Sequence, residues 1–234
     1  MLVLLICLNV YLGCGHSVTR VPIRIQVDSA IDVSKYSGFV VLPFIEERKS
    51  DDRQVESNED TGQEIGSLMR IGLGRHQHLD IIGTQETMRM LIGESIDEGL
   101  LADVERLVRL GQYLEVDAVI AGSYTFFARS VPRPYYRERY STTLQRYVTD
   151  YQDYLEKTYI LSLRIVIASV DTLEIIRDDK YERSAVQAHT VSSFLVSEVL
   201  PHEGILKNLA KQAISEFTRQ IAPHYETEER FLVR

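Results

Sequence analysis

Cys14 is the residue of this chain whose type and position most directly suggest chemistry. Its thiol follows Met1 to Leu12, an apolar run without charged residues, and the other cysteine of the chain, Cys7, lies inside that run. Removal of the run would leave Cys14 as the single cysteine, so no disulfide could form within the remaining chain. A thiol in this position can instead carry acyl chains, and the sequence predicts lipidation at Cys14.

The residues before Cys14 predict a secretion signal. The apolar run is too short for a transmembrane helix, which needs roughly 20 apolar residues, but it suits the apolar region of a signal peptide. Leu12, Gly13 and Cys14 resemble the end of a bacterial lipoprotein signal, although Tyr11 stands where leucine is usual and no Lys or Arg precedes the run. We expect residues 1–13 to be a signal peptide and residues 14–37 to form a lipidated tether and N-terminal arm.

The residue after the cysteine bears on location. Gly15 is not the aspartate that often retains lipoproteins at the inner membrane. We therefore expect an anchor in the outer membrane that faces the periplasm, with the membrane as one partner of the chain. The alternative is that the apolar run is a buried first strand that carries a chance cysteine.

Tyrosines gather in an insert at residues 128–157. The section from Tyr124 to Tyr159 carries eight of the thirteen tyrosines. Because Tyr and Arg are enriched where interfaces carry their binding energy, the candidate partner-binding residues are Tyr135, Tyr136, Arg137, Tyr140, Tyr147, Tyr151 and Tyr154. Two alternatives remain open: an extended hairpin whose tyrosines cover the domain itself, and one amphipathic helix through Leu144, Tyr147 or Val148, Tyr151 and Leu155.

Signals of catalysis, metal binding and nucleic-acid binding are weak. His76 and His78 could bind a metal only with distant partners, and Gly72-Leu73-Gly74 ends a helical pattern instead of opening one, contrary to a phosphate-binding loop. The net charge of -8 is spread along the chain, which argues against a nucleic-acid partner. We expect no catalytic residues, no metal site and no cofactor.

Hydrophobic periodicity predicts strands mixed with helices. Continuous apolar runs indicate buried strands, and apolar residues at spacings of three and four indicate helices. Asp171-Thr172, between two strand patterns, gives the clearest hairpin signal. The expected order is an edge strand at 21–27, strand 38–44, a helix from 61, strand 79–82, helices 84–92 and 101–114, strand 116–127, a loop at 129–139 within the insert, strands 158–170 and 173–185, and helix 203–222. This order predicts an α/β fold in which a mixed β-sheet is flanked by helices.

Several of these segments resemble the CsgG-like domain of bacterial lipoproteins, which is related to the N-terminal domain of TolB and to LpoB. The motifs are VVLPF (Val40 to Phe44), LGQYLEVDAVIAGS (Leu110 to Ser123) and LRIVIASVDTLEI (Leu163 to Ile175). The resemblance implies a CsgG-like α/β domain over residues 38–222 that contains the Tyr-rich insert, followed by a C-terminal tail at 223–234. It also implies that the shared residues build the sheet and not a catalytic site.

Members of that group secrete fibres through a ring-shaped pore, activate cell-wall synthases or help to assemble envelope machines. A membrane-spanning strand needs about 9–11 residues with one apolar face, whereas charges in the insert fall on both strand parities. We therefore expect an outer-membrane-anchored periplasmic lipoprotein that acts as a non-catalytic scaffold or assembly factor for an unidentified envelope protein. The alternative function is a subunit of a CsgG-type oligomeric secretion pore. Homo-oligomerisation is left open.

Overall fold

The computed structural model describes residues 18–29, 35–47, 60–76, 79–93, 96–190, 202–221 and 223–233. Its contacts divide the chain into two units, one of residues 32–218 and one of residues 1–31 with 219–234. The larger unit contains the main sheet and the smaller unit contains a two-stranded ribbon. Cys14 and the predicted signal peptide lie outside the described residues.

The larger unit is built on a mixed sheet, so the predicted α/β class is confirmed. Its strands are β2 (Gly38–Val41), β3 (Ile45–Glu46), β4 (Asp80–Ile81), β5 (Ala118–Ser141), β6 (Arg146–Ser169) and β7 (Glu174–Thr190). The strand order is β4-β2-β5-β6-β7, with β3 also paired to β5. Strand β2 is parallel to β4 and β5, whereas β5, β6 and β7 form an antiparallel meander.

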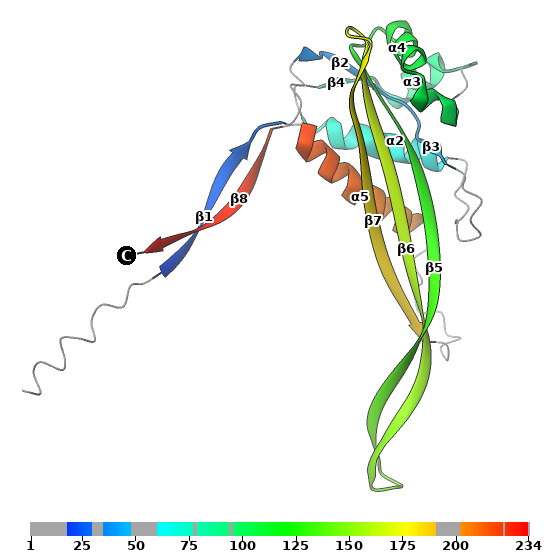
Figure 1. Ribbon diagram of the computed structural model, residues 1–234, viewed down its shortest axis with the longest axis vertical. Coiled ribbons are helices and arrows are strands. Elements are labelled where there is room, and N and C mark those ends of the chain that lie inside the picture. The colour runs from blue at the N-terminus through cyan, green and yellow to red at the C-terminus, as the bar shows by residue number, and fades with distance from the viewer. Residues whose placement is uncertain are drawn as a thin grey trace, which may run out of the picture. The chain divides into compact units, whose positions relative to one another are not determined.

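Helices cover both faces of this sheet. They are α2 (Thr61–Leu73), α3 (Thr84–Met90), the 3-10 helix η2 (Glu98–Ala102), α4 (Val104–Tyr113) and α5 (His202–Ile221). The start of α4 is fixed by Asp103, whose carboxylate accepts a hydrogen bond of 3.0 Å from the backbone N–H of Arg106. Figure 1 shows α2 and α5 crossing β5, β6 and β7, and Gly72 of α2 lies against Ile214 and Thr218 of α5.

Strand alternation divides the apolar core between the two sheet faces. On one face, Val119 and Val166 pack with Leu107 and Leu110 of α4 in a cluster of buried side chains. On the other face, Tyr181 of β7 contacts Phe217 of α5, with ring centroids 6.2 Å apart. The sheet is therefore the middle layer of a helix–sheet–helix arrangement, which explains the continuous apolar runs of its central strands.

The predicted hairpin at Asp171-Thr172 is confirmed, because β6 and β7 join through a turn at residues 170–173. The predicted loop at 129–139 is wrong, since β5 continues to Ser141 and pairs throughout with β6. Proline has no backbone N–H to donate, and Pro132 and Pro134 lie at alternate positions of β5, which face the same edge of the strand. Among the described residues, the edge of β5 away from β6 is paired only at its start, with β2 and β3, so the rest of that edge tolerates proline. The amphipathic helix considered around Tyr147 is likewise wrong, because this segment is strand β6.

The smaller unit is an antiparallel ribbon of β1 (Val18–Val27) and β8 (His224–Val233). Strand β1 covers the segment predicted as an edge strand, and Pro22 lies within it. The segment 223–234, expected to be a C-terminal tail, contains β8 and supplies the pairing partner of β1. The two termini of the described chain, Val18 and Val233, are therefore opposite one another at one end of the ribbon.

Candidate interaction surface

The β5–β6 hairpin continues beyond the third strand of its meander. The last residue of β7, Thr190, pairs with Tyr154 of β6, which itself pairs with Arg133 of β5. Among the described residues, 134–141 and 146–153 therefore form a two-stranded ribbon closed by a turn at 142–145. We call this part, residues 134–153, the distal hairpin. It corresponds to the outer part of the predicted insert.

Four tyrosines occupy one face of the distal hairpin. Tyr136 lies opposite Tyr151, and Tyr140 lies opposite Tyr147. In each pair the ring centroids are 5.4 Å apart, with interplanar angles of 62° and 71°, which is the edge-to-face geometry that aromatic pairs prefer. All four side chains stay exposed, by 52% at Tyr140 up to 71% at Tyr147.

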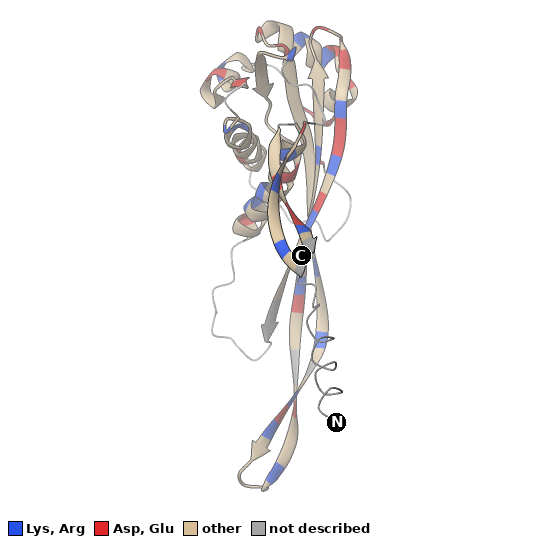
Figure 2. Ribbon diagram, turned by 90° about the vertical axis from the view of Figure 1, so that its left-hand side faces the viewer, with Lys and Arg blue, Asp and Glu red and all other residues tan. Residues whose placement is uncertain are grey.

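The alternate register positions of the distal hairpin carry charge. Arg137 lies opposite Asp150, and the Arg139 Nε lies 2.7 Å from an oxygen of the Asp150 carboxylate. Tyr135, opposite Gln152, belongs to the same set of register positions. Figure 2 shows several Lys and Arg bands on this hairpin. The distal hairpin therefore has its four tyrosines on one face, together with Glu138, and Arg137, Arg139 and Asp150 on the other.

The structure thus brings together four of the seven predicted partner-binding residues, Tyr136, Tyr140, Tyr147 and Tyr151. The other three, Tyr135, Arg137 and Tyr154, occupy the opposite parity, with half-buried Tyr154 at the base of the hairpin. Cross-strand aromatic pairs are a means by which a two-stranded ribbon, marginal on its own, gains stability. The pairing nevertheless leaves more than half of each of the four tyrosine side chains exposed.

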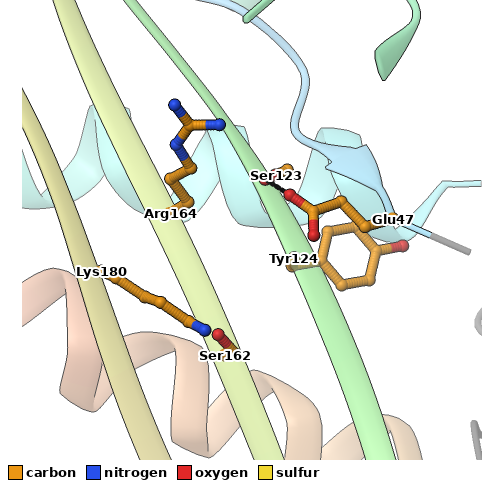
Figure 3. A pocket seen from close by; sticks show the side chains of 6 residues that line it. All are labelled: Glu47, Ser123, Tyr124, Ser162, Arg164 and Lys180. Carbon is orange, nitrogen blue, oxygen red and sulfur yellow. Dashed lines mark hydrogen bonds between the residues drawn. The ribbon is translucent and has the colours of Figure 1, made fainter. Parts of the chain in front are cut away.

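A polar pocket lies on the main sheet, where sequence reasoning predicted none. Figure 3 shows its six lining residues: Glu47 after β3, Ser123 and Tyr124 on β5, Ser162 and Arg164 on β6, and Lys180 on β7. The buried Ser123 hydroxyl donates a hydrogen bond of 2.5 Å to Glu47. The Lys180 side chain reaches from β7 toward Ser162. The signal in the sequence was the occurrence of serine, arginine and lysine inside otherwise apolar strands.

Arg164, one of the charged residues of this pocket, is paired with a carboxylate of the neighbouring strand. Arg164 donates two hydrogen bonds, of 2.8 and 2.7 Å, to the two oxygens of Asp178. These bonds lower the pKa of the Asp178 carboxyl and raise the pKa of the Arg164 guanidinium. A carboxylate that is held ionised by an arginine is a poor general acid or base near neutral pH. The Arg164–Asp178 pair therefore contributes to the cross-strand stability of β6 and β7.

Within the described residues, no group of three or more His, Cys, Asp or Glu side chains lies close enough together to hold a metal ion. None of the described helices combines the length and the apolar character needed to cross a membrane. Of the weak signals in the sequence, His76 lies in the turn after α2, whereas His78 is outside the described residues.

No family model matches the chain, and no curated protein matches it. Solved structures to which it is similar include bacterial lipoproteins. A lipoprotein from Neisseria meningitidis has 13% identity and a TM-score of 0.39 over 77% of this chain and 97% of that one. A minor lipoprotein from Acinetobacter baumannii has 10% identity and a TM-score of 0.30, with coverages of 80% and 90%. The LpoB C-terminal domain from Salmonella enterica has 12% identity and a TM-score of 0.35, with coverages of 67% and 84%.

Proposed function

We propose that this chain is a lipoprotein, anchored through Cys14 in the outer membrane and facing the periplasm, that acts as a non-catalytic scaffold or assembly factor of a cell-envelope complex. The distal hairpin is its partner-binding element. One observation supports this proposal above all. The four tyrosines lie on the part of the β5–β6 hairpin that extends past the end of β7, and each of their side chains is more than half exposed. Exposed Tyr side chains beside arginines have the composition of surfaces that bind proteins.

The charge pattern of the hairpin favours this function over a secretion pore. A strand that spans a membrane must present one apolar face to lipid. Glu138 shares the strand parity of the four tyrosines, as does Lys157 below the distal hairpin, while Arg137 and Arg139 lie on the other parity. Neither face of the distal hairpin is therefore apolar, so contact of either face with lipid would expose charges to hydrocarbon.

Photocrosslinking from the hairpin tests the partner-binding element. A photoreactive amino acid at Tyr147 should capture one envelope protein in cells, whereas the same amino acid at Tyr113 should not. Tyr113 is a matched control because it is a tyrosine of similar exposure, 66% against 71%, that lies on α4. Capture of the same protein from both positions, or of none from Tyr147, would contradict the proposal.

Metabolic labelling with palmitate tests the anchor separately. The wild-type chain should incorporate the label and fractionate with outer membranes, and Cys14→Ser should do neither. Label that persists in Cys14→Ser would show that the lipid is attached elsewhere. A wild-type chain that stays unlabelled and water-soluble would remove the anchor from the proposal and leave the crosslinking result to stand alone.

A further inference from the structure

The two ends of the β1–β8 ribbon differ in their connections. At one end Val27 lies opposite His224, and His224 follows closely on α5. At the other end Val18 lies opposite Val233. We call this second end, residues 18–22 with 229–233, the free end of the ribbon. In the sequence it is the end that follows Cys14, with only residues 15–17 between them.

The two halves of the ribbon also differ in charge. The free end carries Arg20 and Arg230 against a single carboxylate, Glu229, and its sequence ends in Phe231, Leu232 and Val233. The other half, residues 23–27 with 224–228, carries Glu226 and Glu228 against a single arginine, Arg24. The positive and apolar residues of β8 are therefore concentrated at the end nearest the predicted lipid.

Phe231 is the apolar centre of the free end and is 60% exposed. The Arg20 guanidinium lies over its ring, 5.5 Å from the ring centroid. Arg20 also pairs with Glu229 at 3.6 Å, and Arg230 pairs with Glu228 at 3.4 Å. All four side chains are mostly exposed, so these ion pairs contribute little in water and leave both arginines accessible. An exposed aromatic ring beneath an accessible guanidinium is the combination that suits a lipid–water interface.

The tether limits how far the free end can lie from an anchored cysteine. Four residues from Cys14 to Val18 span at most about 14 Å even when fully extended. Two further residues lead to Arg20, so its backbone lies at most about 21 Å from Cys14, against a Debye length of about 10 Å at 0.1 M salt. A tether this short keeps the free end near the membrane surface and allows Arg20 and Arg230 to reach it. The opposite end of the ribbon, at Val27, lies about 31 Å beyond Val18, at roughly 3.4 Å per residue.

From these observations we infer that the free end of the ribbon binds the surface of an anionic phospholipid bilayer, with Phe231 in the interface and Arg20 and Arg230 at lipid phosphates. The inference rests on the proposed lipidation of Cys14 and adds to it a second membrane contact made by folded protein. Charge complementarity selects this occupant: the arginines match anionic headgroups, while the acidic half of the ribbon is repelled from them.

A tryptophan placed in the ribbon tests the contact directly, because the chain contains none. The chain from residue 14 onward has one cysteine, so Cys14 can be coupled to maleimide lipid in vesicles that contain phosphatidylglycerol. On these vesicles Phe231→Trp should show blue-shifted emission that brominated lipid quenches, and high salt should weaken both effects. If the tethered Phe231→Trp variant instead emits like a fully solvated indole, the inference is overturned.

The other half of the ribbon supplies matched controls. Tyr225 lies on the same strand and face as Phe231, is 62% exposed, and has Arg24 over its ring at 5.0 Å. Tyr225→Trp should keep solvated emission on the same vesicles. A blue shift of equal size at both positions would indicate non-specific adsorption of the ribbon and would also overturn the inference.

A partition measurement separates this inference from the anchor. The Cys14→Ser chain should bind vesicles that contain phosphatidylglycerol more tightly than vesicles of phosphatidylcholine alone. Arg20→Gln should reduce that binding by about fivefold, the equivalent of about 1 kcal/mol per basic residue at an anionic surface, and Arg24→Gln should not reduce it. If Arg20→Gln and Arg24→Gln reduce vesicle binding equally, the ribbon contact is contradicted, even where palmitate labelling succeeds. If labelling fails but Arg20→Gln alone reduces binding, only the lipidation of Cys14 is contradicted.

Discussion

The Asp117 carboxylate joins two segments of the larger unit by accepting hydrogen bonds from both the backbone N–H and the hydroxyl of Ser37, at 2.7 and 2.6 Å. The backbone N–H of Gly38 donates a third bond, of 3.2 Å, to the same oxygen. Ser37 precedes β2 and Asp117 precedes β5, which are parallel neighbours in the sheet. One carboxylate therefore aligns the starts of two strands.

We predict that Asp117→Ala destabilises the fold at neutral pH by about 1–3 kcal/mol, the range for lost hydrogen bonds to a charged group. The bonds from Ser37 hold the pKa of the Asp117 carboxyl below its ordinary value of 3.8. A lowered pKa in the folded state gives stabilisation that is present above the ordinary pKa and is lost as the pH falls through the folded one. Urea unfolding from pH 7 to about pH 3 should therefore show the difference between wild type and variant shrinking.

A control for Asp117 is Asp171→Asn, which changes an exposed carboxylate in the β6–β7 turn. This variant should unfold at nearly the same urea concentration as the wild type at every pH. A difference between wild type and Asp117→Ala that stays constant down to about pH 3 would show that the carboxylate charge is not what stabilises this junction.

Gly122 lies inside the apolar part of β5 at a point of close approach. A Cβ atom at this position would lie 2.3 Å from Cε1 of Phe44 and 2.4 Å from the backbone oxygen of Arg164. We predict that Gly122→Ala destabilises the protein by about 1–3 kcal/mol through overpacking. In contrast, Gly204→Ala in α5 places its Cβ in open space and should be neutral or stabilising by up to about 1 kcal/mol. Chemical denaturation of both variants checks the prediction, which fails if they unfold alike.

Tyr181 makes stability depend on pH at the alkaline end. Burial, followed by the nearby Asp179 charge, raises the pKa of its hydroxyl to about 12. Because the raised pKa favours the neutral form in the folded state, its stabilisation is complete below the ordinary pKa of 10.0 and is lost between there and about 12. Tyr181→Phe should therefore lose less stability than the wild type across this interval, as measured by urea unfolding. Tyr113→Phe, at an exposed position, should follow the wild-type curve.

Local sequence patterns predicted most of the fold because its elements bury apolar faces. The signals for the amphipathic helix before Pro223 and for the helix from Thr61 came from residues close together in the sequence. The same holds for the turn at Asp171-Thr172. The extension of β5 was missed because Pro132 and Pro134 have low strand propensity and four arginines interrupt the apolar pattern. These residues lie in the sheet because β6 pairs with β5 over its whole length and because, among the described residues, the other edge of β5 is paired only at its start. Both are properties of the tertiary structure.

The candidate site was predicted by composition but not by geometry. Tyr136 and Tyr140 are spaced as Tyr147 and Tyr151 are, so a turn centred between residues 143 and 144 places all four on one face. Locating that turn in advance would have separated them from Tyr135 and Tyr154. The Glu47–Ser123 and Arg164–Asp178 contacts could not be predicted, because they require the registers of several strands at once. The pairing of β1 with β8 joins two segments that are far apart in the sequence and leaves no local signal.

The tyrosine pairs of the distal hairpin should stabilise the hairpin itself as well as offer a surface to a partner. We predict that Tyr140→Ser and Tyr147→Ser each accelerate amide hydrogen exchange within residues 134–153, and that the double variant shows a coupling of about 0.2–1 kcal/mol between the two rings. Exchange in the parts of β5, β6 and β7 that pack on α5 should not change, because these strands have their own buried core. Tyr113→Ser should leave the exchange of the hairpin as in the wild type. Additive effects of the two single variants would mean that the rings do not support one another, and their edge-to-face arrangement would then serve only an external partner.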